Sequence, residues 1–430
     1  MNQKQFKYQV DDVLPAKETF LYGLQWLLVL VPLVLILGQV GAGLHYPLHP
    51  QLQLLYLQKM FFSTGLVLIL QLLWGHKLPV IVGPASILLL GIIVNAGATD
   101  AVYSSIALCG VLLACLAAGG ILKWLTDFFT MRIIGIVLLL ISFTLLPTVL
   151  HFITAAPDFS FGQGIFAVGL VLVMLAGQRF LPELLRSTII VWALLAGSGA
   201  YYLFFEHPIP VQIEPVSIAA AWQSVGLVFA MDWSVFISFL FCFMALTAND
   251  LGSVQTTAVL LGRSDAAQRT KWGLVFTGLG NGLAGILGVL GPVNYSLSTG
   301  VILASGCASR YPLMAAAVAM MSLACIPAVL YAFSYIPSVV VGSLLFYMLC
   351  AQISGGLGVL SNTLVPYRFE FGIVVGVPVL LGTCIAFLPA PIGAAIPSLW
   401  RPLVTNGFVV GVTVAIILEK LLLPETRKLT

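Results

Sequence analysis

Charged side chains are scarce in this chain. Asp, Glu, Lys and Arg make up 8% of the 430 residues, whereas a soluble globular protein carries about 25%. Hydrophobic side chains make up 60% of the sequence, so the composition excludes an ordinary soluble protein and predicts an all-α polytopic protein embedded in the lipid bilayer. The net charge of +3 is small and the basic residues are scattered. The chain therefore lacks the clustered basic face of a nucleic-acid-binding protein, and we expect no nucleic-acid partner.

Cysteine and histidine patterns exclude further kinds of site. The 7 cysteines all fall inside apolar segments and form no CxxC pair, which indicates small core residues and not a disulfide or metal framework. The 5 histidines lie near the ends of apolar segments, without the i, i+4 spacing of a helical zinc site. We interpret them as interfacial residues. Since no nucleophile–base pair or metal cluster stands out, we expect neither an enzyme nor a bound cofactor.

The apolar runs set the expected topology. Segments of about 20 apolar residues predict fourteen transmembrane spans, at 20–42, 52–74, 78–97, 102–122, 133–155, 161–178, 187–205, 233–251, 272–290, 291–308, 312–334, 336–357, 370–389 and 403–423. All but two of the 18 Lys and Arg residues then fall at the two termini or in the even-numbered connections, the exceptions being Lys59 and Arg401. Because cytoplasmic segments hold the excess of Lys and Arg, both termini are expected on the cytoplasmic side of the cell (inner) membrane.

Two Gly-Pro pairs interrupt apolar runs, at Gly83-Pro84 and Gly291-Pro292. Proline removes a backbone donor and disfavours helix at the residue before it, so the third and tenth spans are expected to be broken and to contain short extended segments. Non-helical backbone at membrane depth is tolerated only where protein or a wet cavity satisfies it. Paired breaks of this kind indicate the binding site of a transporter. Two proline kinks that only help helices to pack are the alternative.

The spacing of the breaks predicts the domain organisation. The broken spans are seven apart, so the chain divides into two repeats of seven spans, 1–212 and 213–430, and an odd number per repeat makes them inverted. The linker between them is expected to be external, with a short interfacial helix at 216–227, and no soluble domain is expected. The GxGxxG pattern of Gly280–Gly285 lies within a span and predicts tight helix packing instead of a dinucleotide site.

Four segments resemble the nucleobase/ascorbate transporter family, which includes uracil and xanthine permeases. They are Gly23-Leu24-Gln25-Trp26, 272–285, 295–310 and 406–411. The resemblance runs through most of the chain and implies a core domain of 20–122 plus 233–335 and a gate domain of 123–232 plus 336–423. It also implies an elevator mechanism, a homodimer, and a small-molecule substrate held between core and gate at two half-helix ends.

The chain departs from the family at the residues that carry its chemistry. Trp26 stands in place of the histidine of the family's GLQH pattern. Asn249 corresponds to the family's eighth-span glutamate and Thr277 to its ninth-span aspartate. Leu297-Ser298 corresponds to the tenth-span Gln-Asn or Glu-Asn pair, which in relatives contacts the base. These differences leave the substrate and the coupling ion open.

Asp250 is the only carboxylate in the eighth or ninth span. An acid inside a bilayer costs about 2.5–3.5 kcal/mol on insertion scales, so we expect Asp250, with Thr277, to take part in coupling. A helix-end acid near the cytoplasmic face is the alternative. If the family's acid has moved by one position, its direction on the helix has changed by about 100°.

Polar side chains near the breaks form the expected substrate site. Ser86 and Ser296 stand beside half-helix N-termini, whose N–H groups favour an anionic or strongly polar ligand. Tyr295 offers an aromatic face for stacking, with ordinary core packing as the alternative. The serines and threonines of this region could instead bond only to carbonyls of their own helix. The expected substrate-binding residues are Ser86, Ile87, Asn249, Ser253, Tyr295, Ser296, Leu297 and Ser298.

These features predict a secondary active transporter. We expect a symporter for a nucleobase such as uracil, xanthine or a related purine or pyrimidine, driven by a proton or sodium gradient. One alternative is an anion transporter of the related sulfate-transporter type. A membrane-embedded enzyme or a non-transporting sensor is a second alternative, although a sensor would normally carry a soluble output domain.

Overall fold

The computed structural model of the chain describes residues 6–47, 49–95, 97–120, 130–154, 160–182, 185, 189–205, 229–295, 298–332, 335–361, 369–389, 392, 395–396 and 400–422. The linker helix expected at 216–227 lies outside these residues. The helices are α1 (Ala16–His45), α2 (Pro50–Leu73), α3 (Ser86–Val94), α4 (Thr99–Ala118), α6 (Met131–Thr144), α7 (Leu146–Thr154), α8 (Phe161–Phe180), α10 (Ile189–Phe204), α12 (Trp233–Leu260), α13 (Ala266–Leu287), α14 (Ser298–Ser305), α15 (Tyr311–Ala324), α16 (Pro327–Ala332), α17 (Ser338–Ser361), α18 (Phe369–Ala386), α20 (Arg401–Val404) and α21 (Gly407–Leu422). The strands are β1 (Val82–Pro84) and β2 (Pro292–Asn294).

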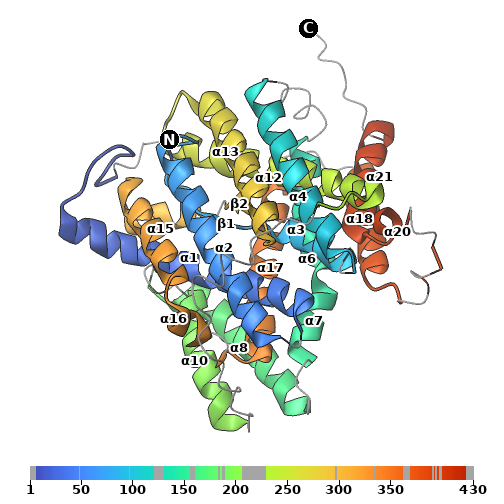
Figure 1. Cartoon of the computed structure of the whole chain (residues 1–430), viewed down its shortest axis with the longest axis horizontal. Helices are drawn as coiled ribbons and strands as arrows, with labels where there is room; N and C mark the ends of the chain where they lie inside the picture. The colour runs from blue at the N-terminus through green and yellow to red at the C-terminus, as the bar shows by residue number, and fades with distance from the viewer. Residues whose placement is uncertain are drawn as a thin grey trace.

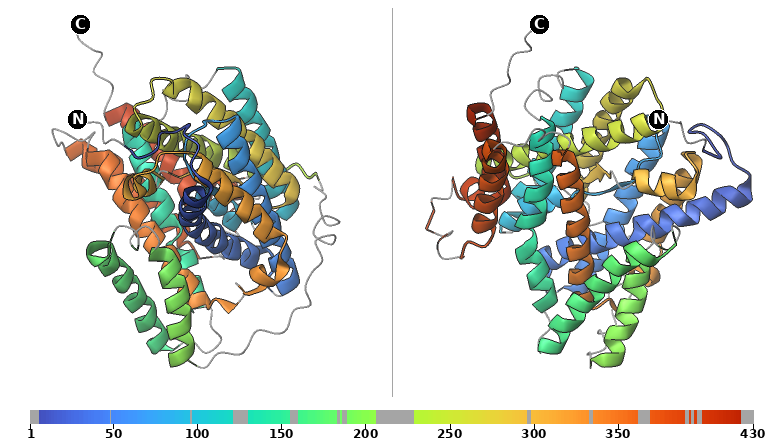
Figure 2. Two further views of the ribbon diagram at one scale, coloured as in Figure 1. Left: turned by 90° about the vertical axis from the view of Figure 1, so that its left-hand side faces the viewer. Right: turned by 180° about the vertical axis from the view of Figure 1, so that it is seen from behind.

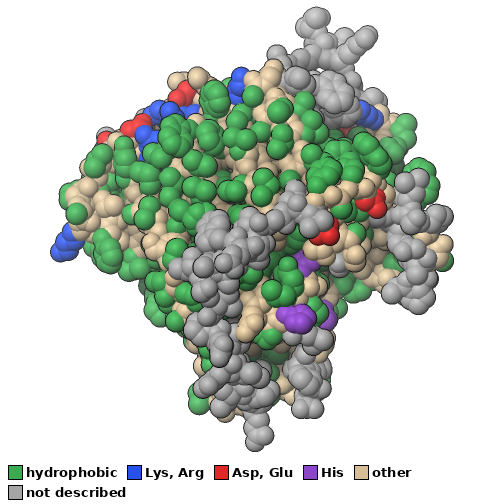
Figure 3. All heavy atoms as spheres, viewed as in Figure 1, with side chains coloured by type: hydrophobic (Ala, Val, Ile, Leu, Met, Phe, Trp, Pro, Cys, Tyr) green, Lys and Arg blue, Asp and Glu red, His purple; other side chains and the backbone are tan. Residues whose placement is uncertain are grey.

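The fold is that of a multi-pass helical membrane protein. Among the described residues, 8 helices are long and apolar enough to cross a bilayer by length and composition. The space-filling view shows a broad apolar surface with many of the Lys and Arg side chains along its upper edge (Figure 3). The count of fourteen spans and the inverted relation of the halves stay predictions.

The two strands lie at the centre of the molecule, surrounded by helices (Figure 1). They pair antiparallel, with Val82 opposite Asn294 and Pro84 opposite Pro292, and every residue of both strands is buried. Each strand leads into a short helix, β1 into α3 and β2 into α14. Pro84 and Pro292 lack a backbone N–H, so neither can donate a hydrogen bond to the opposite strand. Bonds beside the strands extend the ladder: Ala85 N donates to Gly291 O at 2.8 Å, and Tyr295 N donates to Ile81 O at 2.9 Å.

The helices pack in two groups. Around the strands, α4 packs on α13 and α12, α2 packs on α15 and α13, and α1 packs on α15. In the second group, α17 packs on α6, α7 and α8, while α18 packs on α21 and α6. Figure 2 shows the molecule from two further sides, and in its right-hand panel the C-terminal helices α18 and α21 form one edge of the molecule.

The contact between α4 and α13 depends on glycine. A Cβ on Gly278 would lie 2.5 Å from the backbone nitrogen of Ala114, and one on Gly110 would lie 2.5 Å from that of Gly282. A side chain at either position would therefore push the helix backbones apart. This confirms the prediction that the glycines around 280–285 are a helix-packing surface.

Candidate functional site

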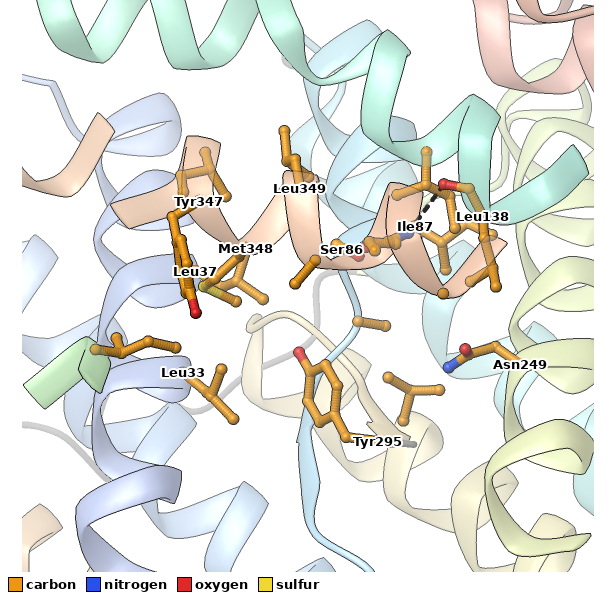
Figure 4. Close-up of a pocket in the computed structure, with 18 residues that line it drawn as sticks. Leu33, Leu37, Ser86, Ile87, Leu138, Asn249, Tyr295, Tyr347, Met348 and Leu349 are labelled. Carbon is orange, nitrogen blue, oxygen red and sulfur yellow. Dashed lines mark hydrogen bonds between the residues drawn. The ribbon is translucent and has the colours of Figure 1, made fainter. Parts of the chain in front are cut away.

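A cavity of about 300 Å³ borders the two strands. Its walls come from α1, the β1–α3 junction, α6, α10, α12, β2 and α17 (Figure 4). The lining is mostly apolar, and none of the described lining residues is charged. The polar side chains among them are Ser86, Asn249, Tyr295, Tyr347 and Gln352. This chemistry suits a small, uncharged ligand with hydrogen-bonding groups and an apolar face.

Asn249 brings an amide to the cavity from α12 (Figure 4). Its Nδ2 donates to the carbonyl oxygen of Asn294 at 3.3 Å. Ser253, one turn further along α12, shares its one Oγ–H donor between the same carbonyl at 3.0 Å and Asn249 O at 2.9 Å. Ser253 does not line the cavity among the described residues, so of these two predicted site residues only Asn249 can meet a ligand there.

The β1–α3 junction contributes Ser86 and Ile87 to the cavity. They are the first two residues of α3, where backbone N–H groups have no partner within the helix and the helix dipole is positive. This end of the helix favours an electronegative ligand atom. Both residues were expected at the site from the position of the first break.

Tyr295 forms part of the floor of the cavity and is held in place by β1. Its hydroxyl donates to Pro84 O at 2.5 Å. A Cβ on Gly83 would lie 2.4 Å from Cε2 of the ring, so glycine is required for the ring to lie against the strand. The ring is thus fixed by one hydrogen bond and one close contact, and its cavity side is available for stacking (Figure 4).

Asp250 lies outside the cavity lining and is completely buried. Its Oδ1 accepts a hydrogen bond from the backbone N–H of Asn294 at 2.6 Å, and its Oδ2 accepts one from Thr277 Oγ1 at 2.5 Å. Since consecutive helical residues point about 100° apart, Asn249 faces the cavity while Asp250 faces β2 and α13. The carboxylate therefore joins β2 to α13 through Thr277.

Further polar side chains extend this network on the side of Asn294 away from the cavity. Gln71 Nε2 donates to Thr277 Oγ1 at 3.0 Å, and Asn294 Nδ2 donates to the same oxygen at 3.3 Å. His76 Nε2 lies 3.2 Å from Asn294 Oδ1, while His76 Nδ1 accepts from Leu78 N at 3.0 Å. Because Nδ1 is an acceptor, Nε2 carries the proton and donates to Asn294.

His76, which the sequence analysis interprets as an interfacial residue, faces the protein interior. Its side chain is completely buried, because its two ring nitrogens are satisfied inside the protein, by Leu78 and Asn294. Gln71 was missed as well. No local pattern indicates which residues either side chain contacts, since their partners in this network lie more than two hundred positions away in the chain.

The remaining predicted residues follow β2. Ser298 Oγ accepts a hydrogen bond from Ile81 N at 2.9 Å and donates to Tyr295 O at 2.6 Å, so it ties the start of α14 to the segment before β1. Ser296 and Leu297 lie outside the described residues. Trp26, at the family's histidine position, is buried in the core and is not among the described lining residues. The described residues contain no group of three or more His, Cys, Asp and Glu placed to hold a metal.

Sequence reasoning missed the wall formed by α17. Tyr347, Met348 and Gln352 line the cavity from this helix. The Tyr347 hydroxyl accepts a hydrogen bond from Gln178, and Gln352 Nε2 donates to Leu138 O at 3.4 Å (Figure 4). An amide within an apolar span was the one signal that could have identified Gln352. The rest of this wall is apolar and carries no motif.

Several known proteins resemble this chain over most of its length. It is 23% identical to the xanthine permease XanP of Escherichia coli (strain K12), over 98% of this chain and 95% of that protein. It is 25% identical to the uric acid permease PucK of Bacillus subtilis (strain 168), over 94% of this chain and 95% of that protein. A putative purine permease of the same Bacillus strain, YwdJ, is 23% identical over 86% of this chain and 89% of its own length.

Solved structures share the fold at lower identity. The transmembrane domain of the cyanobacterial bicarbonate transporter BicA superposes with a TM-score of 0.61 at 14% identity, over 89% of this chain and all of that domain. Murine Slc26a9, an anion transporter in the inward-facing state, superposes with a TM-score of 0.58 at 16% identity, over 96% of this chain and 69% of that one. The family model described as the Permease family (Xan_ur_permease) matches residues 17–391. The chain therefore belongs to the xanthine/uracil permease family.

Proposed function

We propose that this protein is a secondary active transporter of a nucleobase such as xanthine, uracil or a related purine or pyrimidine. The observation that carries the proposal is the uncharged cavity beside the two strands, where two amides, three hydroxyls and two aromatic rings lie around the first turn of α3. A flat heterocycle has polar edges that can bond to the amides and hydroxyls, and apolar faces that can stack on an aromatic ring. A volume of about 300 Å³ is at the lower end of the usual range for ligand pockets, which suits a small solute.

The arrangement that goes with this function has fourteen spans in two inverted repeats, 1–212 and 213–430. Core (20–122 plus 233–335) and gate (123–232 plus 336–423) would move against each other in an elevator mechanism. Support comes from the two groups of packed helices, which divide along these lines, and from the cavity, whose walls come from both. We also propose a homodimer in the cell membrane, with both termini cytoplasmic.

Uptake into proteoliposomes tests the function. The purified chain is reconstituted and offered radiolabelled xanthine, uric acid, uracil and bicarbonate, with an imposed proton gradient, an imposed sodium gradient or neither. We expect saturable uptake of at least one base that is stimulated by one of the two gradients. Uptake of bicarbonate alone would overturn the nucleobase proposal.

The position of Ser86 allows a direct test of the site. Ser86→Trp would fill the space above the first turn of α3, so uptake should be abolished while the protein stays folded and inserted. Unchanged transport by this variant would place the ligand elsewhere. Ser253→Ala is the control, because Ser253 lies near the strands but outside the cavity lining.

For coupling, we propose that Asp250 takes part with Thr277, and that the coupling ion is a proton or sodium. A buried carboxylate is costly to keep charged. A change in its protonation or in its cation partner would therefore alter its hydrogen bond with Asn294 N of β2. Asp250→Asn keeps the size of the side chain. This variant should exchange substrate between equal pools but lose accumulation against a gradient. Full accumulation by Asp250→Asn would show that Asp250 only joins β2 to α13.

Anion transport is the second candidate, because the solved structures that share this fold include a bicarbonate transporter and an anion transporter. The positive end of α3 at Ser86 would suit an anion. The absence of a Lys or Arg among the described lining residues favours the neutral base. The bicarbonate arm of the uptake experiment separates the two.

A further inference from the structure

A second hollow lies away from the substrate cavity, where the turn after α2 meets the first turns of α13. We call it the turn groove. Its volume is about 540 Å³, and its main lining residues are Trp74, Lys77, Asp265, Gln268, Arg269 and Trp272. Both segments fall in connections that the Lys and Arg pattern predicts to be cytoplasmic. The groove is thus expected at the level of the lipid headgroups on that side.

The groove combines indole rings with basic side chains. Trp74 is 58% exposed and Trp272 is 43% exposed, large values for side chains with so much apolar surface. Lys77 is exposed, and Lys271 Nζ lies 6.0 Å from the centre of the Trp272 ring. Tryptophan concentrates at the boundary between headgroups and acyl chains, and basic pockets at the cytoplasmic side of membrane helices bind anionic lipid headgroups.

The charge of the groove is positive on balance. Asp265, the one acid among the described lining residues, is shared between two arginines, with Oδ1 at 2.9 Å from Arg269 Nε and 3.4 Å from Arg263 Nε. The hydrogen bond from Arg269 holds the pKa of the Asp265 carboxyl below its usual value, so this acid is charged at neutral pH. Lys77 and Lys271 have no acidic neighbour among the lining residues other than Asp265.

Lys77 adopts a backbone conformation that is unusual for lysine. Its φ is 55°, and it is the one residue other than glycine with a positive φ in the part of the chain that the structure describes. Asn and Gly adopt this region far more readily. Lys77 N donates to Gln71 O at 3.0 Å, and Lys77 O accepts from Arg269 Nη1 at 3.1 Å. These bonds fix the turn with the lysine side chain in the groove, and strain of this kind is found at binding sites.

We propose that the turn groove binds the phosphate of an anionic phospholipid from the bilayer, with Lys77 contacting the phosphate oxygens, Arg269 holding the turn in place behind it, and the two tryptophans packing against the glycerol and upper acyl chains. A lipid and not a free phosphate ion is the occupant, because only a lipid uses the exposed indole rings as well as the charges. Arg269 also donates to His76 O at 2.9 Å, and His76 contacts Asn294 of β2. A bound headgroup is therefore linked to the frame of the cavity, although the lipid site stands whether or not the chain carries a nucleobase.

Lipid binding to the full-length protein tests this directly. The purified protein in detergent is titrated with phosphatidylglycerol, and bound lipid is measured by native mass spectrometry. Lys77→Asn removes the charge and keeps a residue suited to positive φ, and it should weaken binding about fivefold. The matched pair Gln268→Glu and Gln268→Lys changes the charge at one exposed position, and should weaken and strengthen binding, respectively, by about the same factor. Lys17→Asn, at the start of α1 and outside the groove, should leave binding unchanged.

Two further arms distinguish the ligand. Phosphatidylcholine, which has the phosphate but no net charge, should bind more weakly than phosphatidylglycerol, and inorganic phosphate at the same concentration should not displace the lipid. Complete displacement by inorganic phosphate would overturn the lipid assignment. Equal binding by Gln268→Glu and Gln268→Lys would overturn the site itself, and this pair decides the question even if Lys77→Asn fails to fold.

Discussion

The two walls of the cavity are built in different ways. On the strand wall, main-chain bonds between the strands are backed by a buried polar network that includes Asp250, Thr277 and Asn294. On the α17 wall, the lining is mostly apolar, and the hydrogen bond of Gln352 to Leu138 O is long at 3.4 Å. Directional bonds fix atoms in place, whereas apolar contacts allow one surface to slide past another. We therefore propose that the strand wall selects the solute and that the α17 wall moves relative to it.

The largest effect is expected from removing the acid behind the strand wall. Asp250→Ala leaves Asn294 N and Thr277 Oγ1 without their acceptor and should cost about 2–5 kcal/mol of stability. Thermal unfolding in detergent measures this. Asp11→Ala is the control, since Asp11 is a surface acid with 53% of its side chain exposed and its ion pairs should contribute less than about 1 kcal/mol. Equal losses of stability in Asp250→Ala and Asp11→Ala would show that the polar network does not hold the strand wall more firmly than a surface ion pair would.

A smaller effect, on affinity and not on stability, is expected at Asn249. Asn249→Ala removes an amide that lines the cavity, and the KM for uptake should rise about tenfold. The unfolding temperature should hardly change, because Ser253 Oγ still donates to Asn294 O. Ser253→Ala removes the other bond to that carbonyl from outside the cavity, so its KM should stay the same. A larger rise in KM for Ser253→Ala than for Asn249→Ala would contradict this assignment.

The smallest effect is expected on the α17 wall. Gln352→Ala loses only a weak hydrogen bond, and the KM should change by less than about threefold. Initial uptake rates over a range of substrate concentrations give this value. A rise in KM comparable to that of Asn249→Ala would show that both walls recognise the solute, which would contradict the assignment of selection to the strand wall.

The sequence predicted the location of the strand wall but not how it is joined. The Gly-Pro pairs at 83–84 and 291–292 mark the places where the two short strands occur, because proline acts locally. The pairing of Val82 with Asn294 joins segments more than two hundred residues apart, and nothing in either segment specifies the register. For Asn249 and Asp250, the sequence predicted only that their side chains point in different directions from the same helix.

The α17 wall was beyond sequence reasoning for a physical reason. Its residues contribute mainly apolar surface, and apolar residues fill every span of a membrane protein, so a cavity-lining leucine or methionine looks like one that faces lipid. His76 illustrates the opposite error. A histidine near the end of a span suggested the membrane interface, yet the turn after α2 carries it into the polar network around Asn294.

The strand ladder has a consequence for how transporters of this kind could diversify. The bonds that extend it, from Ala85 N to Gly291 O and from Tyr295 N to Ile81 O, join main-chain atoms, so the geometry of the frame depends little on which side chains are attached nearby. Side chains such as Asn249 can therefore be exchanged while the frame persists. A laboratory selection for growth on a different heterocycle should accordingly recover substitutions at Asn249, and leave Gly83 and Pro84 untouched.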